Sequence, residues 1–410
     1  MIKKRLSRLK KMVQEYPRQF WILIGSSFID SLGGTILFPF FTLYITKRFG
    51  IGMAQAGILL AIFSLSGMAG SLVGGALADR LGRKIMIILG LLLSAGSSLV
   101  MGFINELEVF YFVAVIVGLL SDIGRPAREA MIADLLPDEQ RAGGFGVFRV
   151  IHNLAWVIGP SIGGFLAARS YMSLFVTDAV MSTITALLIL RFIFDTKPQK
   201  AEEHEHQSFR AILAGYRHVL KNGIFVAFVL VSLLMLLVYQ QLYSTFSVFL
   251  RDYRGISESG FGMLMSFNAV LVVLFQFWIS RLVGKRNPFL MLALGTVFYL
   301  FGYTAFGYVH GFFFFLGAVV LITIGEMIMM PVQMSIVAKL SPEDMRGRYM
   351  AASGFSWSVA SMAGPWGAGM IMDNYDPNLV WKICGIISLF AIAGFIGLYF
   401  KSRRIKQFSG

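Results

Sequence analysis

The sequence predicts an all-α integral membrane protein, with twelve transmembrane helices in two pseudo-symmetric six-helix bundles. The first observation is composition: of 410 residues, 57% are hydrophobic and 14% are charged, with a mean hydropathy of +0.72. A water-soluble core of this size would need more polar surface to cover it. The other two observations are a series of long apolar segments and an internal repeat.

The apolar segments have the length of membrane-spanning helices, which need about 20 residues each. Their continuous apolar runs, rich in Gly and Ala, favour helices over barrel strands, which alternate over about ten residues. The twelve expected spans are Gln19–Tyr44, Ala54–Ala78, Ile85–Ile104, Val109–Leu135, Gly143–Ala168, Met172–Phe194, Gly223–Leu250, Gly260–Leu282, Phe289–Tyr308, Phe312–Leu340, Tyr349–Met372 and Leu379–Phe400.

The repeat relates the two halves of the chain by one register. With only 11 prolines available, several matches in a single register are hard to obtain by chance. Two similar hydrophobic halves are typical of a transporter whose halves rock about a site between them. We expect an N-terminal bundle at 1–194, a linker at 195–222 and a C-terminal bundle at 223–410. The pairs 205 positions apart are Gly50 and Gly255, Pro126 and Pro331, Pro137 and Pro342, Arg141 and Arg346, and Gly159-Pro160 and Gly364-Pro365.

The basic residues predict orientation in a membrane rather than nucleic-acid binding. The chain carries 36 Lys and Arg against 22 Asp and Glu, a net charge of +14. Most of the basic residues fall in the tails and the even-numbered loops, so both termini are expected in the cytoplasm and the protein in the plasma membrane. Cys384 is the single cysteine, which excludes an intramolecular disulfide or a cysteine metal cluster.

The linker between the halves contains an amphipathic stretch. Apolar residues recur at helical spacing from Phe209 to Leu220, which predicts an interfacial helix on the cytoplasmic leaflet. His204 and His206 precede it in an acidic run, where a solvated linker is expected rather than a metal site.

The strongest local motif lies between the second and third spans, in the stretch from Gly75 to Lys84. Its glycines permit close helix approach and a tight turn, its aspartate can cap a facing helix, and its basic pair holds the turn in the cytoplasm. A membrane-anchoring loop is the simpler reading. The motif residues are Gly75, Asp79, Gly82, Arg83 and Lys84.

This motif resembles the Gly-x-x-x-Asp-x-x-Gly-Arg-Lys signature of the major facilitator superfamily, and the spans and the repeat extend the resemblance over the whole chain. The resemblance implies the major facilitator fold and a cytoplasmic gate latch. In such a latch Asp79 engages the start of span eleven near the Arg346 turn, matched by Arg141 in the first half, and Arg83 engages Asp134. The second-half copy at 276–286 lacks the aspartate, so a latch there should be weaker or formed differently.

A second motif lies in span five, around Gly159-Pro160. Small residues let helices touch, and a proline inside a helix removes one hydrogen bond. It resembles a Gly-Pro-x-x-Gly-Gly motif of drug:proton antiporters, with Ala155 in place of the leading Gly; a purely structural kink is the alternative. The packing residues are Gly159, Pro160, Gly163, Gly164, Gly364 and Pro365.

Two carboxyl residues lie near the middle of predicted spans, Asp30 in span one and Glu326 in span ten. A charge at that depth costs about 2.5 to 3.5 kcal/mol on insertion scales, so such residues face a cavity or a partner. Both are candidates for proton coupling. The alternatives are a permanent pair with Arg125, Arg149 or His152, or recognition of a cationic substrate. Resemblance favours Glu326, because some multidrug efflux members carry a span-ten Glu in a similar Gly-Glu-x-x-x-x-Pro setting.

Further polar residues point to a network and a cavity. Charges on span four and the adjacent part of span five can neutralise one another along the helices, as a gate or packing network or, less well, as an anion site. Polar and aromatic residues near the middle of span seven are candidate cavity residues. The network residues are Asp122, Arg125, Arg128, Glu129, Asp134, Arg149 and His152, and the cavity residues are Tyr239, Gln240 and Tyr243.

The function expected from these features is proton-coupled export of lipophilic or amphipathic compounds by alternating access. Symport of a small polar metabolite and flipping of a lipid or glycolipid remain as alternatives. No P-loop or hydrolase motif is present, so we expect a transporter rather than an enzyme. We expect protons as the coupling ion, no other cofactor, no metal, and a monomer in the lipid bilayer.

Overall fold

The structure is a computed structural model, and it describes residues 16–196, 219–284, 286–342 and 345–402. A few side chains within these ranges, including those of Asp79 and Arg346, are not described. The linker histidines and nearly all of the predicted amphipathic helix lie outside the described residues. Both remain predictions.

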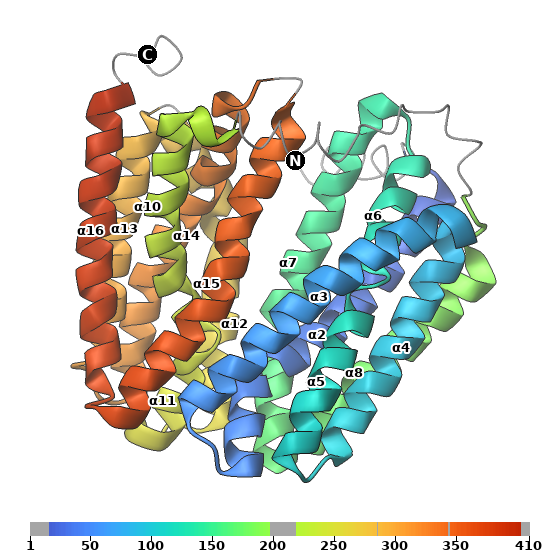
Figure 1. Cartoon of the computed structure of the whole chain (residues 1–410), viewed down its shortest axis with the longest axis horizontal. Helices are drawn as coiled ribbons and strands as arrows, with labels where there is room; N and C mark the ends of the chain where they lie inside the picture. The colour runs from blue at the N-terminus through green and yellow to red at the C-terminus, as the bar shows by residue number, and fades with distance from the viewer. Residues whose placement is uncertain (1–15, 197–218, 285, 343–344, 403–410) are drawn as a thin grey trace, which may run out of the picture. The chain divides into compact units, whose positions relative to one another are not determined.

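The described part of the chain is helical, without strands (Figure 1). Long apolar segments form helices because a helix satisfies every backbone polar group within the segment, as a membrane requires. The helices are α2 (Arg18–Phe49), α3 (Met53–Leu81), α4 (Arg83–Phe103), α5 (Leu107–Ser121), α6 (Arg125–Asp134), α7 (Asp138–Arg169), α8 (Tyr171–Phe192), α10 (Gly223–Tyr239), the 3₁₀ turn η1 (Gln240–Leu242), α11 (Thr245–Arg254), α12 (Glu258–Val283), α13 (Pro288–Phe306), α14 (Phe312–Leu340), α15 (Arg346–Asn374) and α16 (Asn378–Ser402).

Eleven helical segments of the described residues are long and apolar enough to cross a membrane. They correspond to eleven of the twelve predicted spans. The remaining span is α15, which is 29 residues long but rich in Gly and Ser, and it falls outside the eleven. Large apolar side chains such as Phe112, Phe313 and Phe390 are exposed, as expected of surfaces that face lipid.

Two predicted spans are broken rather than continuous. Span four divides at Asp122–Gly124 into α5 and α6. Arg125 and Glu129 both lie on α6, and the expectation that the charges of span four neutralise one another stays a prediction. Span seven divides between α10 and α11, where a 3₁₀ turn replaces the helix. At this break, side chains donate hydrogen bonds to backbone carbonyl groups. Gln241 Nε2 donates to the Leu237 carbonyl at 2.8 Å, and Ser244 Oγ donates to the Gln240 carbonyl at 2.8 Å.

The described residues form two compact units, one of residues 16–38 and 62–196 and the other of residues 39–61, 219–284, 286–342 and 345–402. The segment 39–61, which is the end of α2 and the start of α3, therefore packs with the second half of the chain. The prediction that the domains follow the halves of the sequence stays a prediction.

Each unit has its own core. In the first unit, α4 packs against α5, α6 and α8, and buried apolar residues such as Phe20, Met86, Met131 and Ile189 join α2, α4, α6 and α8. In the second unit, α13 packs against both α14 and α16 (Figure 1). The rings of Phe246 and Phe306 stack there, with centroids 4.1 Å apart.

Candidate functional site

In the first unit, Asp30 on α2 forms an ion pair with Arg128 on α6. Arg128 Nη1 lies 2.8 Å from Asp30 Oδ2, and the two side chains are only 14% and 19% exposed. Ser182 Oγ on α8 donates to the other carboxylate oxygen at 3.1 Å. A permanent pair with Arg125, Arg149 or His152 was the alternative to proton coupling by Asp30, and the structure pairs Asp30 with Arg128 instead. Proton coupling by Asp30 stays a prediction. A new helix, α6, begins after the break at Asp122–Gly124. The direction of the Arg128 side chain therefore cannot be predicted from helical spacing along a continuous span four.

A second carboxyl group in this unit, Asp178 on α8, was missed by the sequence analysis. It is 7% exposed, and Ser98 Oγ on α4 donates to its Oδ2 at 2.5 Å. Gly33 on α2 leaves room for it, because a Cβ at that position would lie 3.0 Å from Asp178 Oδ1. The available signal was an acidic residue inside a predicted span, the same signal that identified Asp30 and Glu326. We call Asp30, Arg128, Ser182, Asp178 and Ser98 the Asp30 cluster.

His152 on α7 lies beside α2. Its Nδ1 is 3.3 Å from Ser31 Oγ, and its Nε2 accepts the indole N–H of Trp156 at 3.3 Å. Because Nε2 accepts, the proton of a neutral ring sits on Nδ1.

The other predicted network residues stay apart from the Asp30 cluster. Arg125 is 58% exposed and lies 3.8 Å from Asp122, while Glu129 and Arg149 are exposed. The predicted network is thus divided between the Asp30 cluster and the surface.

In the second unit, Glu326 is the middle residue of α14, which runs from Phe312 to Leu340. Its carboxylate receives two hydrogen bonds: Tyr239 OH donates to Oε1 at 3.1 Å, and Asn268 Nδ2 on α12 donates to Oε2 at 3.1 Å. Asn268 Nδ2 also donates to Thr323 Oγ1 at 2.8 Å. Within the described part of the chain, no basic side chain pairs with Glu326. We call Glu326, Tyr239, Asn268 and Thr323 the Glu326 site.

Aromatic rings surround the Tyr239 side of this site. The Tyr239 ring stacks on Tyr299 at 6.3 Å with an angle of 9°, and lies 5.7 Å from Trp357 on α15. Its hydroxyl is 3.2 Å from that of Tyr243. A phenol has one proton, so if Tyr239 donates to Glu326, Tyr243 must donate to Tyr239. The break of span seven places these residues, since Tyr239 ends α10 and Gln240 begins the 3₁₀ turn.

The predicted latch residues of the first unit lie at the end of α3. The helix continues through Gly75 and Asp79 to Leu81, so the motif is mostly helix rather than turn, and Gly82 makes the turn with φ +101°. Arg83 Nε lies 2.8 Å from Asp134 Oδ2, the pairing implied by resemblance, and Thr196 Oγ1 donates to the same oxygen at 3.1 Å.

The rest of the latch is described in part. Lys84 Nζ donates to the Leu190 carbonyl at 2.8 Å, and Arg141 Nε to the Ala133 carbonyl at 3.0 Å. The side chains of Asp79 and Arg346 lie outside the description, and the gating role of all these residues stays a prediction.

Glycines mark the closest helix contacts. A Cβ at Gly159 on α7 would collide with Thr35 on α2, whose hydroxyl donates to the Ala155 carbonyl at 3.0 Å. Pro160 and Pro365 lie inside helices that continue past them. Contact between α3 and α5 is made at Gly70, where a Cβ would collide with the Leu119 carbonyl, whereas a Cβ at Gly75 would meet only an ordinary contact.

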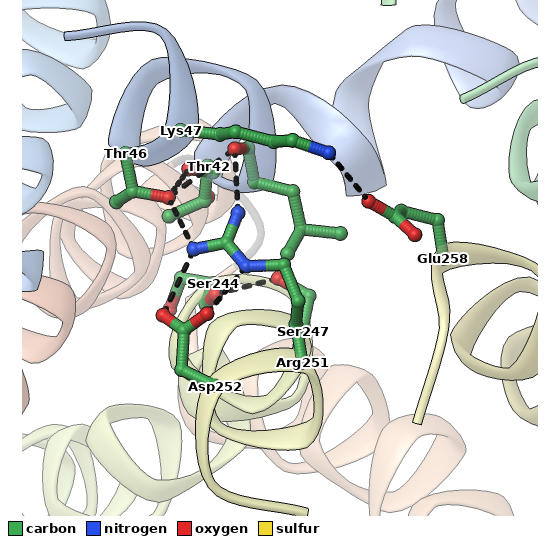
Figure 2. Close-up of polar contacts among 9 residues, drawn as sticks. Thr42, Thr46, Lys47, Ser244, Ser247, Arg251, Asp252 and Glu258 are labelled. Carbon is green, nitrogen blue, oxygen red and sulfur yellow. Dashed lines mark hydrogen bonds and ion pairs between the residues drawn. The ribbon is translucent and has the colours of Figure 1, made fainter. Parts of the chain in front are cut away.

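Charged side chains at helix ends form hydrogen bonds and an ion pair with the segment 39–61 within the second unit (Figure 2). Arg251 Nη1 donates to the Leu43 carbonyl at 3.0 Å, and Nη2 donates to Thr46 Oγ1 at 3.1 Å. Asp252 accepts from Nε and Nη2 of the same guanidinium at 2.6 and 2.8 Å. Lys47 Nζ lies 3.6 Å from Glu258 Oε1.

Asp373, near the end of α15, caps the start of α3. Its two oxygens accept the backbone N–H groups of Met53 and Ala54 at 2.9 and 2.8 Å, where the positive end of the helix dipole favours a carboxylate. The two helices touch closely, since a Cβ at Gly57 would lie 2.5 Å from the backbone of Trp366.

Comparison with known proteins bears on the family and the fold. A family model for the Major Facilitator Superfamily matches residues 23–331 and 242–407. A Na(+), Li(+), K(+)/H(+) antiporter of Planococcus maritimus is 27% identical over 380 residues, covering 86% of this chain and 89% of that protein. The quinolone resistance protein NorA of Staphylococcus aureus is 32% identical over 180 residues, covering 44% of this chain and 46% of NorA.

Solved structures share the fold. A mutant of the nucleoside transporter NupG superposes with a TM-score of 0.79 over 93% of this chain and 100% of its own, at 15% sequence identity. At this identity the likeness shows the fold alone. The predicted all-α membrane fold is confirmed.

Proposed function

Because the chain belongs to the Major Facilitator Superfamily, we propose that this membrane transporter exports lipophilic or amphipathic compounds in exchange for protons. Alternating access would carry substrate and proton in opposite directions across the membrane. Protons are the coupling ion in this proposal. We also propose that the transporter acts as a monomer in the plasma membrane with both termini in the cytoplasm.

The Glu326 site carries this proposal. An ionised carboxylate at the middle of a spanning helix is costly unless a proton or a cation compensates it. Its hydrogen-bond partners, Tyr239 and Asn268, are neutral, so neither neutralises its charge. Glu326 can therefore hold a proton in one step of the cycle and a cationic substrate in another.

The surroundings of Glu326 support a substrate with apolar and cationic parts. Tyr239 and Trp357 lie next to each other there, and aromatic faces attract organic cations as well as apolar groups. The name of the partial relative NorA, a quinolone resistance protein, supports export of foreign compounds. A polar-metabolite symporter and a lipid flippase remain the alternatives to test.

The test is transport in proteoliposomes of uniform orientation. An imposed proton gradient, acidic on the side corresponding to the cell exterior, should drive a fluorescent lipophilic cation toward that side, and an uncoupler should abolish the movement. Glu326→Gln should reduce gradient-driven movement to the level of empty liposomes. The control is Asp30→Asn combined with Arg128→Met, which removes another intramembrane carboxylate together with its charged partner and should leave gradient-driven movement in place.

Three results would contradict the proposal. Movement of the cation with the protons would indicate symport, and lipid movement that is independent of the gradient would indicate flipping. Full proton coupling in Glu326→Gln would remove the proposed role of Glu326.

A second candidate function is exchange of monovalent metal cations for protons. It is favoured by the relative from Planococcus maritimus, whose name is Na(+), Li(+), K(+)/H(+) antiporter and which aligns over 86% of this chain. Adding sodium or potassium outside proteoliposomes with an acidic lumen should then alkalinise the lumen. An unchanged internal pH would exclude this candidate and leave the export of organic compounds standing.

A further inference from the structure

Asp178 is a buried carboxyl group that takes no part in the exchange proposed at Glu326. It lies seven residues into α8, which begins at Tyr171, about 10 Å along the helix axis. Its side chain is 7% exposed, and its hydrogen-bond partner, Ser98, is 8% exposed. Nothing in the proposed exchange at Glu326 requires a second acidic group here.

The Asp30 cluster contains one more carboxyl group than it contains basic groups. Asp30 and Asp178 lie at the same contact between α2 and α8: Ser182, one turn after Asp178, donates to Asp30, and Gly33, one turn after Asp30, lies against Asp178 Oδ1. The single guanidinium, Arg128, is bound to Asp30 at 2.8 Å. His152 does not add a charge, because its Nε2 accepts a hydrogen bond from Trp156. Two ionised carboxylates would therefore leave one negative charge uncompensated.

An uncompensated charge at this position is unfavourable. Burial of an ionised carboxylate without a charged partner costs so much that the group takes up a proton instead. Within the described residues, no ion pair is found for Asp178. Ser98 suits either protonation state, since a hydroxyl can donate to a carboxylate or accept from a carboxylic acid.

A metal cation fits this position less well than a proton. Hard cations take several oxygen ligands, and no group of three or more His, Cys, Asp or Glu side chains that could hold a metal is present among the described residues. Arg128, bound to the neighbouring Asp30, would also repel a metal cation.

We propose that Asp178 is a second proton-binding site of the transporter, protonated in this conformation and held by Ser98. The carboxylate takes its proton from water and returns it to water when the cluster rearranges. The use of this proton in transport rests on the proposed function. The protonation itself rests only on the charge balance of the Asp30 cluster.

The experiment measures protonated carboxyl groups directly and needs no substrate. Infrared difference spectra between acidic and alkaline buffer are recorded for the full-length protein in proteoliposomes. The wild-type protein should show carbonyl bands of protonated carboxyl groups that are lost on alkalinisation. Asp178→Asn should lack one component, Glu326→Gln a different one, and the double variant both.

The outcomes separate this proposal from the one about export. A spectrum of Asp178→Asn identical to that of the wild type overturns the inference, whatever the transport assay shows. Loss of the Asp178 component when sodium replaces choline at constant pH also overturns it, in favour of a metal cation. Failure of the export assay leaves the spectral result intact.

A second variant protects the test against misfolding. If Asp178→Asn is not recovered as a folded protein, Ser98→Ala carries the test, because it keeps the carboxyl group and removes only its hydrogen bond. The Asp178 component should then move in frequency without being lost. An unmoved spectrum in Ser98→Ala overturns the inference.

Discussion

Asp30 in the first unit and Glu326 in the second unit are held in different ways. In the first unit Asp30 is bound to a guanidinium, Arg128, at 2.8 Å. In the second unit Glu326 is bound by a phenol and an amide, both at 3.1 Å. The guanidinium compensates the charge of Asp30. The phenol and the amide are neutral, so only a proton or a bound cation can compensate the charge of Glu326.

The difference indicates that these two mid-span carboxyl groups serve different purposes. Separating an ion pair of mostly buried groups is costly, so Asp30 suits a fixed structural or gating role. A carboxyl group with neutral partners can change its protonation without breaking an ion pair, as proton exchange requires. The internal repeat agrees with this difference, because neither Asp30 nor Glu326 has an acidic counterpart in the other half. The residues 205 positions away are Met235 and Ser121.

The largest expected effect is on stability in the first unit. Arg128→Met leaves Asp30 without its charged partner, and loss of one partner of a buried pair costs about 3 to 5 kcal/mol. We expect the free energy of unfolding, measured by denaturant titration in detergent, to fall by about 3 kcal/mol. The control is Asp30→Asn combined with Arg128→Met, which should recover most of the loss. A small effect of Arg128→Met alone would remove the proposed difference between the units.

Much of the fold could be predicted from the sequence because lipid imposes a simple rule on segment length and polarity. That rule located Glu326 at the centre of its helix. The partner of Asp30 was not predictable, because the turn at Asp122–Gly124 has no strong signal in an otherwise apolar span and it determines where Arg128 lies.

Two further features could not be predicted from apolar periodicity: the break of span seven and the pair of Arg83 and Asp134. Side-chain hydrogen bonds of Gln241 and Ser244 stabilise the break of span seven, and such bonds depend on geometry rather than on apolar periodicity. The pair of Arg83 and Asp134 was expected from a family motif rather than from spacing, since the two residues are far apart in the sequence.

The next effect concerns the second unit. Tyr239→Phe removes the phenol that donates to Glu326 at 3.1 Å. A hydrogen bond to a neutral acceptor contributes about 1 kcal/mol and one to a charged acceptor about 1.5 to 3 kcal/mol. A protonated Glu326 therefore predicts a loss of about 1 kcal/mol in the free energy of unfolding. The same substitution beside Glu326→Gln should cost a similar amount, and a much smaller loss there would show that Glu326 is ionised.

An effect of similar size is expected where the second unit does use charge, at the ends of helices. Asp373→Ala removes the cap of α3 at Met53 and Ala54, and loss of such a cap costs about 1 kcal/mol. Asp373→Asn should cost less, because an amide oxygen can still accept one of the two N–H groups. Equal losses in the two variants would assign the effect to the charge of Asp373 and the helix dipole rather than to the hydrogen bonds.

The smallest effect is expected for the pair of Lys47 and Glu258. The two charged atoms are 3.6 Å apart, and the Lys47 side chain is 60% exposed, so water and salt screen the attraction. Lys47→Gln should change the free energy of unfolding by less than about 0.5 kcal/mol, and the change should vanish in high salt. Arg128→Met is the matched comparison, since its partner Asp30 is only 19% exposed and its loss should persist in high salt. If the two losses respond equally to salt, burial does not separate the two pairs, and the assignment of Asp30 to a fixed, charge-compensated role fails with it.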